Sequence, residues 1–279
     1  MSFLDILVLA LVQGLAELLP VSSSAHVILA EKLLGLDPTT PAMTLLLVML
    51  HTGTMFAVIV YFWRDWRRTY FGSRDALIAN GKSVALATAV TGVVGLVLLK
   101  LIEHAFAKGS STFEVEQLFG NTKLIATGLT AAGVLIFLSS RRAASSDGRM
   151  SIVSAFWIGA VQGLCLPFRG FSRSGATIST ALLAGVERRR AEEFSFALAV
   201  VLTPAVVARE AMRFHKAFSA GLHAGDFWTL LGPSVLGMAL SFLAGLLALR
   251  WLSGWLEAGR WGYFGFYCLV LGACVFGFA

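Results

Sequence analysis

A carboxylate, a run of serines and a histidine lie within ten residues near the start of the chain, in the segment QGLAELLPVSSSAH. Gln13 and Glu17 are four residues apart, so a helix places both on one face. The serine run follows Pro20, and a helix that opens on serines offers backbone N–H groups that bind anions. A hydroxyl, an imidazole and a carboxylate together can build an activated nucleophile. The segment therefore predicts catalytic roles for Glu17, Ser23 and His26, and substrate-binding roles for Gln13, Ser22 and Ser24.

Each of these residues also has a simpler explanation. An ionisable group in an apolar helix is costly and by default faces a cavity with a partner, but Glu17 as a neutral acid bonded to a backbone carbonyl is the alternative. Serines after a proline can serve as helix caps alone. His51 lies inside a later apolar run, where hydrogen bonding between helices is favoured over the role of a base.

A second polar segment, RGFSRSGAT at 169–177, contains arginines, hydroxyls and glycines but no acid. Arginine binds phosphate through a planar fork and the hydroxyls donate hydrogen bonds, so the segment predicts a cradle for an oxyanion. An arginine inside a membrane protein needs an anionic partner, and Glu17 is the alternative to a phosphate. The predicted roles are catalytic for Arg173 and substrate-binding for Arg169, Ser172, Ser174 and Thr177.

The elements that must position these residues are membrane helices. The 279 residues are 57% hydrophobic and 14% charged, whereas a soluble domain carries roughly 25% charged residues. Five of six runs without Asp, Glu, Lys or Arg reach the roughly 17 residues that a spanning helix needs, and none alternates as a barrel strand would. The six predicted spans are Thr44–Phe62, Ser83–Leu99, Leu124–Ser140, Phe194–Ala208, Phe227–Leu249 and Trp261–Ala279.

The net charge of +6 arises from basic residues between the spans, which favours a topological role over binding of nucleic acid. Arg64–Arg68 and Arg141–Arg142 are two spans apart, and we assign both, with Glu187–Arg190, to cytoplasmic loops. The N-terminus then lies outside. Tryptophans at span ends are expected to anchor at the membrane interface, namely Trp63, Trp66, Trp251, Trp255 and Trp261.

The two polar segments occupy equivalent places in the two halves of the chain. Val12–Leu15 matches Val161–Leu164 at an offset of 149 residues, and Ser23 matches Ser172. Each segment leads into a short apolar helix that ends near a glycine, Gly35 or Gly185, and three charge-free spans follow. We therefore predict a single membrane domain, 1–279, that consists of a first repeat over 1–145 and a second over 146–279.

The apolar pieces beside the polar segments are too short to span a bilayer. Pro20 ends Phe3–Leu19 and Pro167 ends Ile152–Leu166, and about three helical turns follow each break, over Ser24–Leu34 and Gly175–Ala184. This pattern predicts re-entrant hairpins, with a kinked span or an interfacial hairpin as the alternative. Three spans between the hairpins make them enter from opposite faces, so their tips meet near the midplane. The predicted fold is an all-α polytopic membrane protein, an inverted-topology repeat with six transmembrane helices and two re-entrant helical hairpins.

The segments QGLAELLPVSSSAH and GFSRSGAT together resemble the undecaprenyl-diphosphate phosphatase family, also called the bacitracin-resistance proteins. The family pattern is Glu or Gln, three residues, Glu, a PVSSS-type turn and His, followed later by PGxSRSxxT. Length, membrane character and motif spacing also match, so the resemblance covers the whole chain. The matching residues are Gln13 and Glu17 in the first pair, Ser22, Ser23 and His26 in the serine turn, and Ser172, Arg173, Ser174 and Thr177 in the second motif.

The chain departs from the family pattern at two places. Arg169-Gly170-Phe171 stands where Pro-Gly-Thr is common, and Ala25 stands where Gly is usual. Gln13 is within the pattern, but an amide is neither a base nor a charged metal ligand. Glu17 must therefore carry that role alone.

The resemblance implies a phosphatase that removes one phosphate from undecaprenyl diphosphate and so regenerates the lipid carrier for peptidoglycan and other envelope polymers. It also implies a divalent cation, Mg²⁺ or Ca²⁺, which we place near Glu17. The implied location is the bacterial inner membrane, multi-pass, with the active site facing the periplasm. The implied partners are the polyprenyl pyrophosphate and membrane lipids, and a homodimer is left open.

The alternative function is a flippase or transporter of polyprenyl phosphate lipids. Inverted repeats with broken helices are typical of transporters, and such a protein also needs an arginine-lined cavity. The set of Ser23, His26 and Glu17 favours the enzyme, because transport does not require it.

Overall fold

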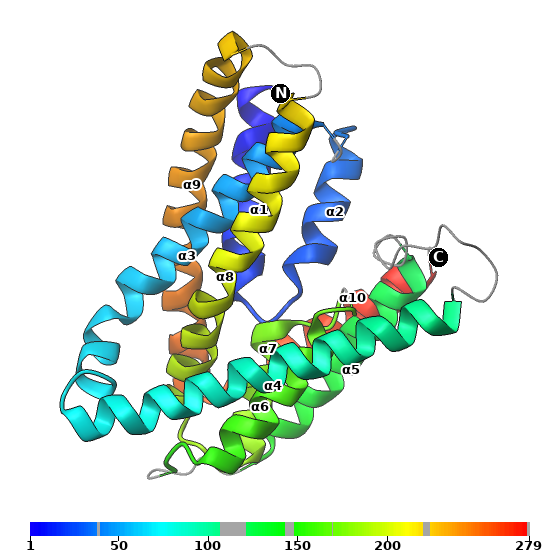
Figure 1. The fold of residues 1–279 in the computed structure, drawn as a ribbon. Coiled ribbons are helices and arrows are strands. Elements are labelled where there is room, and N and C mark those ends of the chain that lie inside the picture. Colours follow the sequence, from blue (N-terminus) through cyan, green and yellow to red (C-terminus); the bar gives the residue numbers. More distant parts are fainter. Residues whose placement is uncertain (38–39, 107–120, 143–147, 169, 220–223, 278–279) are drawn as a thin grey trace. The chain divides into compact units, whose positions relative to one another are not determined.

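The computed structural model describes residues 1–37, 40–106, 121–142, 148–168, 170–219 and 224–277, and the regular structure in these ranges is helical (Figure 1). The two halves of the chain contain similar series of helices, of 16, 11, 29, 33 and 19 residues and then of 14, 11, 32, 34 and 16. The first series is α1 Phe3–Leu18, α2 Ser23–Leu33, α3 Pro41–Thr69, α4 Arg74–Phe106 and α5 Thr122–Ser140. The second is α6 Ile152–Cys165, α7 Arg173–Leu183, α8 Arg188–Ser219, α9 Ala224–Glu257 and α10 Gly262–Gly277.

Five of these helices contain stretches long and apolar enough to cross a membrane. The prediction of an all-helical polytopic membrane protein is therefore confirmed. The sixth predicted span corresponds to α10, whose 16 residues in the described part of the chain fall short of a full crossing. The five stretches are Pro41–Thr69, Arg74–Ala105, Thr122–Ser140, Arg188–Arg209 and Trp228–Glu257.

Short helices flank both polar segments, and glycine ends the second helix of each pair as predicted. Gly35 and Gly185 have φ of 65° and 80°, a left-handed conformation that glycine adopts without steric cost. One residue later, the N–H of Leu36 donates to Glu31 O and that of Val186 donates to Ala181 O, which closes both helices with the same bond. The re-entrant path of these helices stays a prediction.

The chain forms two compact units, and each combines helices from both halves. The helices α3, α8 and α9 each continue from one unit into the other. Unit 1 consists of Met1–Leu19, Ser23–Trp63 and Ala199–Leu252, and unit 2 of Pro20–Ser22, Arg64–Leu198 and Ser253–Ala279.

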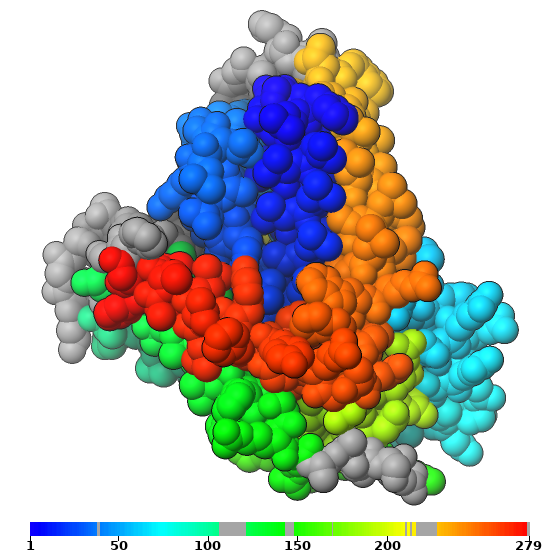
Figure 2. All heavy atoms as spheres, turned by 180° about the vertical axis from the view of Figure 1, so that it is seen from behind, coloured from blue at the N-terminus to red at the C-terminus, as the bar shows by residue number. Residues whose placement is uncertain are grey.

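In unit 1, α1 packs against α2 and against α9. Figure 2 shows α1, in dark blue, lying beside α9, in orange. The contact is close because Gly14 has no side chain: a Cβ there would lie 2.5 Å from Ala244 Cβ and 2.8 Å from Ser241 O. Ile6 and Leu9 of α1 belong to a buried apolar cluster.

In unit 2, α6 packs against α4 and α7, and α5 packs against α7 and α10. Gly163 provides the close approach to α4, because a Cβ there would lie 2.7 Å from Val94 Cβ and 3.0 Å from Thr91 O. Gly163 matches Gly14 in the sequence repeat. In each case the first helix of one half packs on the fourth helix of the other half, so the compact units do not follow the division at 145/146.

The role predicted for the tryptophans is wrong for two of them. Trp66 is 8% exposed and Trp261 is 2% exposed, so neither can anchor at a membrane interface. The indole of Trp66 donates to Glu193 O at 3.2 Å, and that of Trp261 donates to Ser139 Oγ at 3.0 Å. Trp63 and Trp251 are exposed, as interface anchors must be.

Substitution of Gly14 by alanine should destabilise unit 1, since the added methyl must displace the backbone of α9. Overpacking of this kind costs about 1–3 kcal/mol. We expect Gly14→Ala to lower the midpoint of thermal unfolding in detergent, followed by tryptophan fluorescence. Gly92→Ala is the matched control, because a Cβ at Gly92 meets no atom within 4 Å. Equal midpoints for the two variants would show that the contact is not tight.

Candidate active site

The acid, amide and hydroxyl of the first motif form one hydrogen-bonded set in unit 1. Ser23 Oγ donates to Glu17 Oε2 at 2.6 Å, and Gln13 Nε2 donates to the same oxygen at 3.3 Å. The prediction that Gln13 and Glu17 share a helix face is therefore confirmed. Gln13 is 1% exposed and the Glu17 side chain 18% exposed, so the carboxylate lies at the edge of the buried region.

His51 on α3 extends this set. Its Nδ1 lies 2.9 Å from Gln13 Nε2 and 4.0 Å from Glu17 Oε2. The favoured role of His51, hydrogen bonding between helices, is thus confirmed. The contact with the candidate site itself was not foreseen, because His51 is 34 residues from Glu17 and no local spacing joins them.

The turn between α1 and α2 holds Ser22 in a strained conformation. Its φ of 68° is the left-handed region, which Ser22 alone occupies among the described residues other than glycine. Such a backbone costs on the order of 1 kcal/mol and is often found at functional sites. The Ser22 side chain is also buried. Glycine would adopt this backbone conformation without the steric cost, so the serine indicates that the hydroxyl has a function.

The second motif opens α7 in unit 2. Ser172 is the N-cap and accepts from the Gly175 N–H at 3.3 Å, and Arg173 is the first residue of the helix. Thr177 Oγ1 donates to Arg173 O at 2.8 Å and lies 2.6 Å from Ser195 Oγ. The hydroxyls of Ser172, Ser174 and Thr177 are all buried, so they are fixed around the start of the helix.

Two glycines let the backbone of the second motif approach its neighbours. Gly170 has φ of 99°, and a Cβ there would lie 2.3 Å from Ile125 O, so no other residue fits. A Cβ at Gly175 would lie 3.2 Å from Pro20 Cβ. Pro20 O also accepts from Cys268 Sγ at 3.2 Å. Within unit 2, the turn of the first motif therefore lies beside the start of α7.

The structure thus groups the predicted site residues into two sets. Glu17, Ser23 and Gln13 form the first, and Ser172, Ser174 and Thr177 surround the start of α7 with Arg173. Ser24 and His26 lie on α2, both partly exposed. Arg169 lies outside the described residues. The meeting of Glu17 and Ser23 with Arg173 stays a prediction.

Ser195 on α8 was missed by the sequence analysis. It is fully buried and hydrogen-bonded to Thr177. No motif or spacing identifies it, because a serine in an apolar helix is ordinary and only the packing of the helices brings it to the second motif.

Glu17 suits a divalent cation that takes most of its ligands from water and substrate phosphate. Among the described residues, no group of three or more His, Cys, Asp and Glu side chains is arranged to hold a metal ion. A site made by protein ligands alone therefore does not form there. Mg²⁺ commonly binds through one or two carboxylates, several waters and substrate phosphates, and a single carboxylate fits that arrangement.

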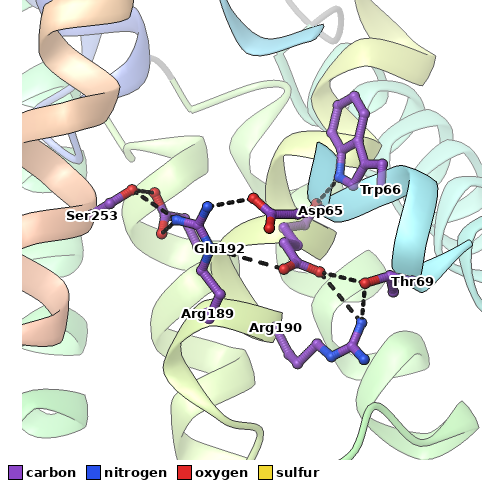
Figure 3. Close-up of polar contacts among 8 residues, drawn as sticks. Asp65, Trp66, Thr69, Arg189, Arg190, Glu192 and Ser253 are labelled. Atoms are coloured by element: carbon purple, nitrogen blue, oxygen red, sulfur yellow. Dashed lines mark hydrogen bonds and ion pairs between the residues drawn. The ribbon is translucent and has the colours of Figure 1, made fainter. Parts of the chain in front are cut away.

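A further polar cluster joins the ends of α3, α8 and α9 in unit 2 (Figure 3). Arg189 pairs with Asp65 and Glu192, and Glu192 also accepts from Ser253 Oγ. Arg190 contacts Thr69 Oγ1 and Glu193. The assignments of Arg64–Arg68 and Arg188–Arg190 to loops are wrong, since these residues belong to α3 and α8. The arginines of the cluster face carboxylates, so it is an internal ion-pair network.

Loss of Arg189 should destabilise unit 2 strongly. Glu192 is fully buried, and a buried carboxylate without its cation typically costs about 3–5 kcal/mol. We expect Arg189→Ala to lower the midpoint of thermal unfolding well below that of Arg188→Ala. Arg188 is the control because its hydrogen bond to Glu257 O, at 3.0 Å, is exposed to solvent. A shift no larger than that of the control would contradict a structural role for the network.

The apolar helices, long enough to span a bilayer, define a polytopic membrane protein. A serine–glutamate pair lies at one helix break, and an arginine begins the helix after the other break. These residues are candidates for binding an anionic group. The family model of the bacitracin resistance protein BacA matches residues 6–274, and the chain belongs to this family. The resemblance seen in the two motifs is therefore confirmed.

Curated relatives cover almost the whole chain. The chain is 60% identical over 277 residues to undecaprenyl-diphosphatase 2 of Acinetobacter baylyi, which covers 99% of this chain and 97% of the relative. It is 35% identical over 276 residues to an undecaprenyl-diphosphatase of Desulfosudis oleivorans, with 95% and 94% covered. Undecaprenyl-diphosphatase 2 of Burkholderia orbicola is 33% identical over 293 residues, with 99% and 97% covered.

Proposed function

We propose that this protein is a phosphatase that hydrolyses undecaprenyl diphosphate to undecaprenyl phosphate and phosphate, and so recycles the envelope lipid carrier. Membership of the family and the 60% identity to an undecaprenyl-diphosphatase support this function. The structural observation that carries it is the 2.6 Å hydrogen bond from the Ser23 hydroxyl to the Glu17 carboxylate. A hydroxyl held on a base within an apolar helical unit is the arrangement of an activated nucleophile.

In the proposed reaction, Ser23 Oγ attacks the terminal phosphorus and passes its proton to Glu17 Oε2. The bond from that phosphorus to the bridging oxygen breaks, and the undecaprenyl phosphate leaves with the bridging oxygen and takes the proton from Glu17. Water then attacks the phosphoserine, gives a proton to Glu17, and releases phosphate while Ser23 Oγ regains its proton. His26, three residues after Ser23 on α2, is the alternative proton acceptor.

Arg173 is proposed to bind the diphosphate with the start of α7. A guanidinium forms paired hydrogen bonds to phosphate oxygens, and the N-terminus of an 11-residue helix adds backbone N–H donors. The buried hydroxyls near this helix start support the assignment. Charge stabilisation of this kind supplies much of the acceleration in phosphoryl transfer. The further proposed binding residues are Gln13, Ser22, Ser24, Arg169, Ser172, Ser174 and Thr177.

We place a divalent cation, Mg²⁺ or Ca²⁺, near Glu17. When bound, such an ion neutralises part of the charge of the diphosphate. The single carboxylate that the first motif offers suits an ion whose remaining ligands are water and phosphate.

The proposed topology has α10 as the sixth span, an inverted relation of the two halves, and an N-terminus outside. The similar helix series of the halves supports the repeat. The basic residues of 64–68 and 141–142 support a cytoplasmic side for the ends of α3 and α5. The active site then faces the periplasm from the inner membrane.

Glu17→Ala and Arg173→Ala should each abolish most of the phosphate release from undecaprenyl diphosphate by purified protein in detergent. General base catalysis and charge stabilisation each contribute about 10²-fold or more, so a loss of at least that size is expected. The variants Glu103→Ala and Arg188→Ala are matched controls, because Glu103 is exposed, Arg188 is partly exposed, and both lie outside the motifs.

The phosphate-release assay, together with a measurement of lipid translocation, separates the proposed function from its alternatives. EDTA should stop turnover of the wild-type protein, and added Mg²⁺ or Ca²⁺ should restore it. Lipid translocation in vesicles without phosphate release would favour the flippase. Wild-type rates in both motif variants would show that the site is elsewhere.

Ser23→Ala should remove the covalent intermediate together with turnover. With substrate labelled at the terminal phosphate, rapid quenching of the wild-type protein should give phosphoserine at residue 23, identified by peptide mass spectrometry. Thr52→Val, which removes only a hydroxyl bonded to its own helix at Val48 O, is the control and should label normally. A Ser23→Ala variant with near-normal turnover would instead indicate direct attack by water.

A further inference from the structure

The side chain of His51 reaches the candidate site from a helix that carries neither motif. His51 lies on α3, and both α3 at this point and α1 belong to unit 1. Its Nδ1 lies 2.9 Å from Gln13 Nε2, and Gln13 is 1% exposed. The amide nitrogen of Gln13 therefore stands between two acceptors, His51 Nδ1 and Glu17 Oε2.

We propose that His51 is a positioning residue of the active site, which acts through Gln13 to orient the carboxylate of Glu17 toward Ser23. The inference rests on the proposed function and deepens it. An amide nitrogen has two hydrogens, and here one points to each acceptor. The reversed amide would place its carbonyl oxygen against Glu17 Oε2, where two acceptors repel. An unprotonated Nδ1 on His51 is a second acceptor that reinforces the orientation in which Gln13 donates to Glu17.

This orientation matters because Gln13 and Ser23 donate to the same carboxylate oxygen. Rotation of the carboxylate about its Cγ–Cδ bond would carry that oxygen away from the Ser23 hydroxyl. The N–H of Gln13 opposes the rotation and adds no charge, so Glu17 keeps its capacity to accept a proton. His51 contributes a fixed acceptor that holds Gln13 in place.

The second half of the chain contains an internal comparison. Gln162 matches Gln13 in the sequence repeat, but Leu166 stands where Glu17 would be. The Gln162 amide is fully buried and donates to Thr91 Oγ1 at 3.1 Å. The amide nitrogen of a glutamine at this place in the fold can therefore bond to a threonine, without a histidine. His51 lies in the first half of the chain, which also contains Glu17.

Three variants test the role of His51 in the phosphate-release assay. His51→Leu removes the acceptor and should lower kcat by about 10- to 100-fold with little change in KM, as expected for a misplaced catalytic group. His51→Asn places an amide oxygen near the position of Nδ1, so it should recover activity to within about 3-fold of the wild type. Thr52→Val, the neighbouring control on α3, should not change kcat. An Asn variant as impaired as the Leu variant would overturn the inference.

A double-mutant cycle separates positioning from a general loss of stability. If His51 acts through Gln13, the combined Gln13→Leu and His51→Leu variant should be no slower than Gln13→Leu alone. Independent losses that multiply would contradict the inference, whatever the thermal stability of the variants.

The labelling rate of Glu17 by a hydrophobic carbodiimide, read by mass spectrometry, tests the inference without turnover. The labelling rate should rise in His51→Leu, because loss of the N–H donor of Gln13 favours the protonated carboxyl that the reagent attacks. In His51→Asn the rate should return to that of the wild type. If the wild-type protein releases no phosphate but this labelling pattern holds, the proposed function fails and the role of His51 stands. An unchanged labelling rate in His51→Leu overturns the role of His51.

Discussion

Polar side chains among apolar helices must find polar partners, since burial of an unpaired charge or amide costs several kcal/mol. This requirement organises the molecule at two places. In unit 1, Glu17 is held by a serine and an amide, and the amide is held by His51. In unit 2, Glu192 is held by Arg189 and Ser253 (Figure 3). The first set contains a hydroxyl bonded to a carboxylate, whereas in the second the carboxylates are paired with arginines.

Close packing of small residues provides the frame for these polar sets. Gly14 and Gly163 let the first helix of each half lie on a span from the other half. Each glycine directly follows a glutamine, so the same packing that brings the helices together also fixes Gln13 and Gln162 at buried positions. The halves are thereby interleaved, and neither compact unit is made from one half alone. In one half the buried glutamine supports an acid, and in the other it bonds to Thr91.

Much of the candidate site was predictable because its residues lie close together along the chain. The four-residue spacing of Gln13 and Glu17 determines a shared helix face, and Ser23 follows Glu17 after one turn. Ser172 was likewise recognisable as a hydroxyl at a helix start. His51 and Ser195 were not recognisable as site residues, because each reaches its motif through contact between helices distant in sequence. The strained φ of Ser22 also had no sequence signal.

The sequence by itself determined the helical membrane character, the helix breaks and their glycine stops, because hydropathy and backbone preferences act over a few residues. It also predicted the family, since both motifs are short and contiguous. Only the tertiary structure decided which helices of one half pack on helices of the other half. It also decided that Trp66 and Trp261 are buried and that Arg189 pairs with Asp65. These features depend on side chains more than a hundred residues apart or on the rotation of one helix against another, which local patterns do not encode.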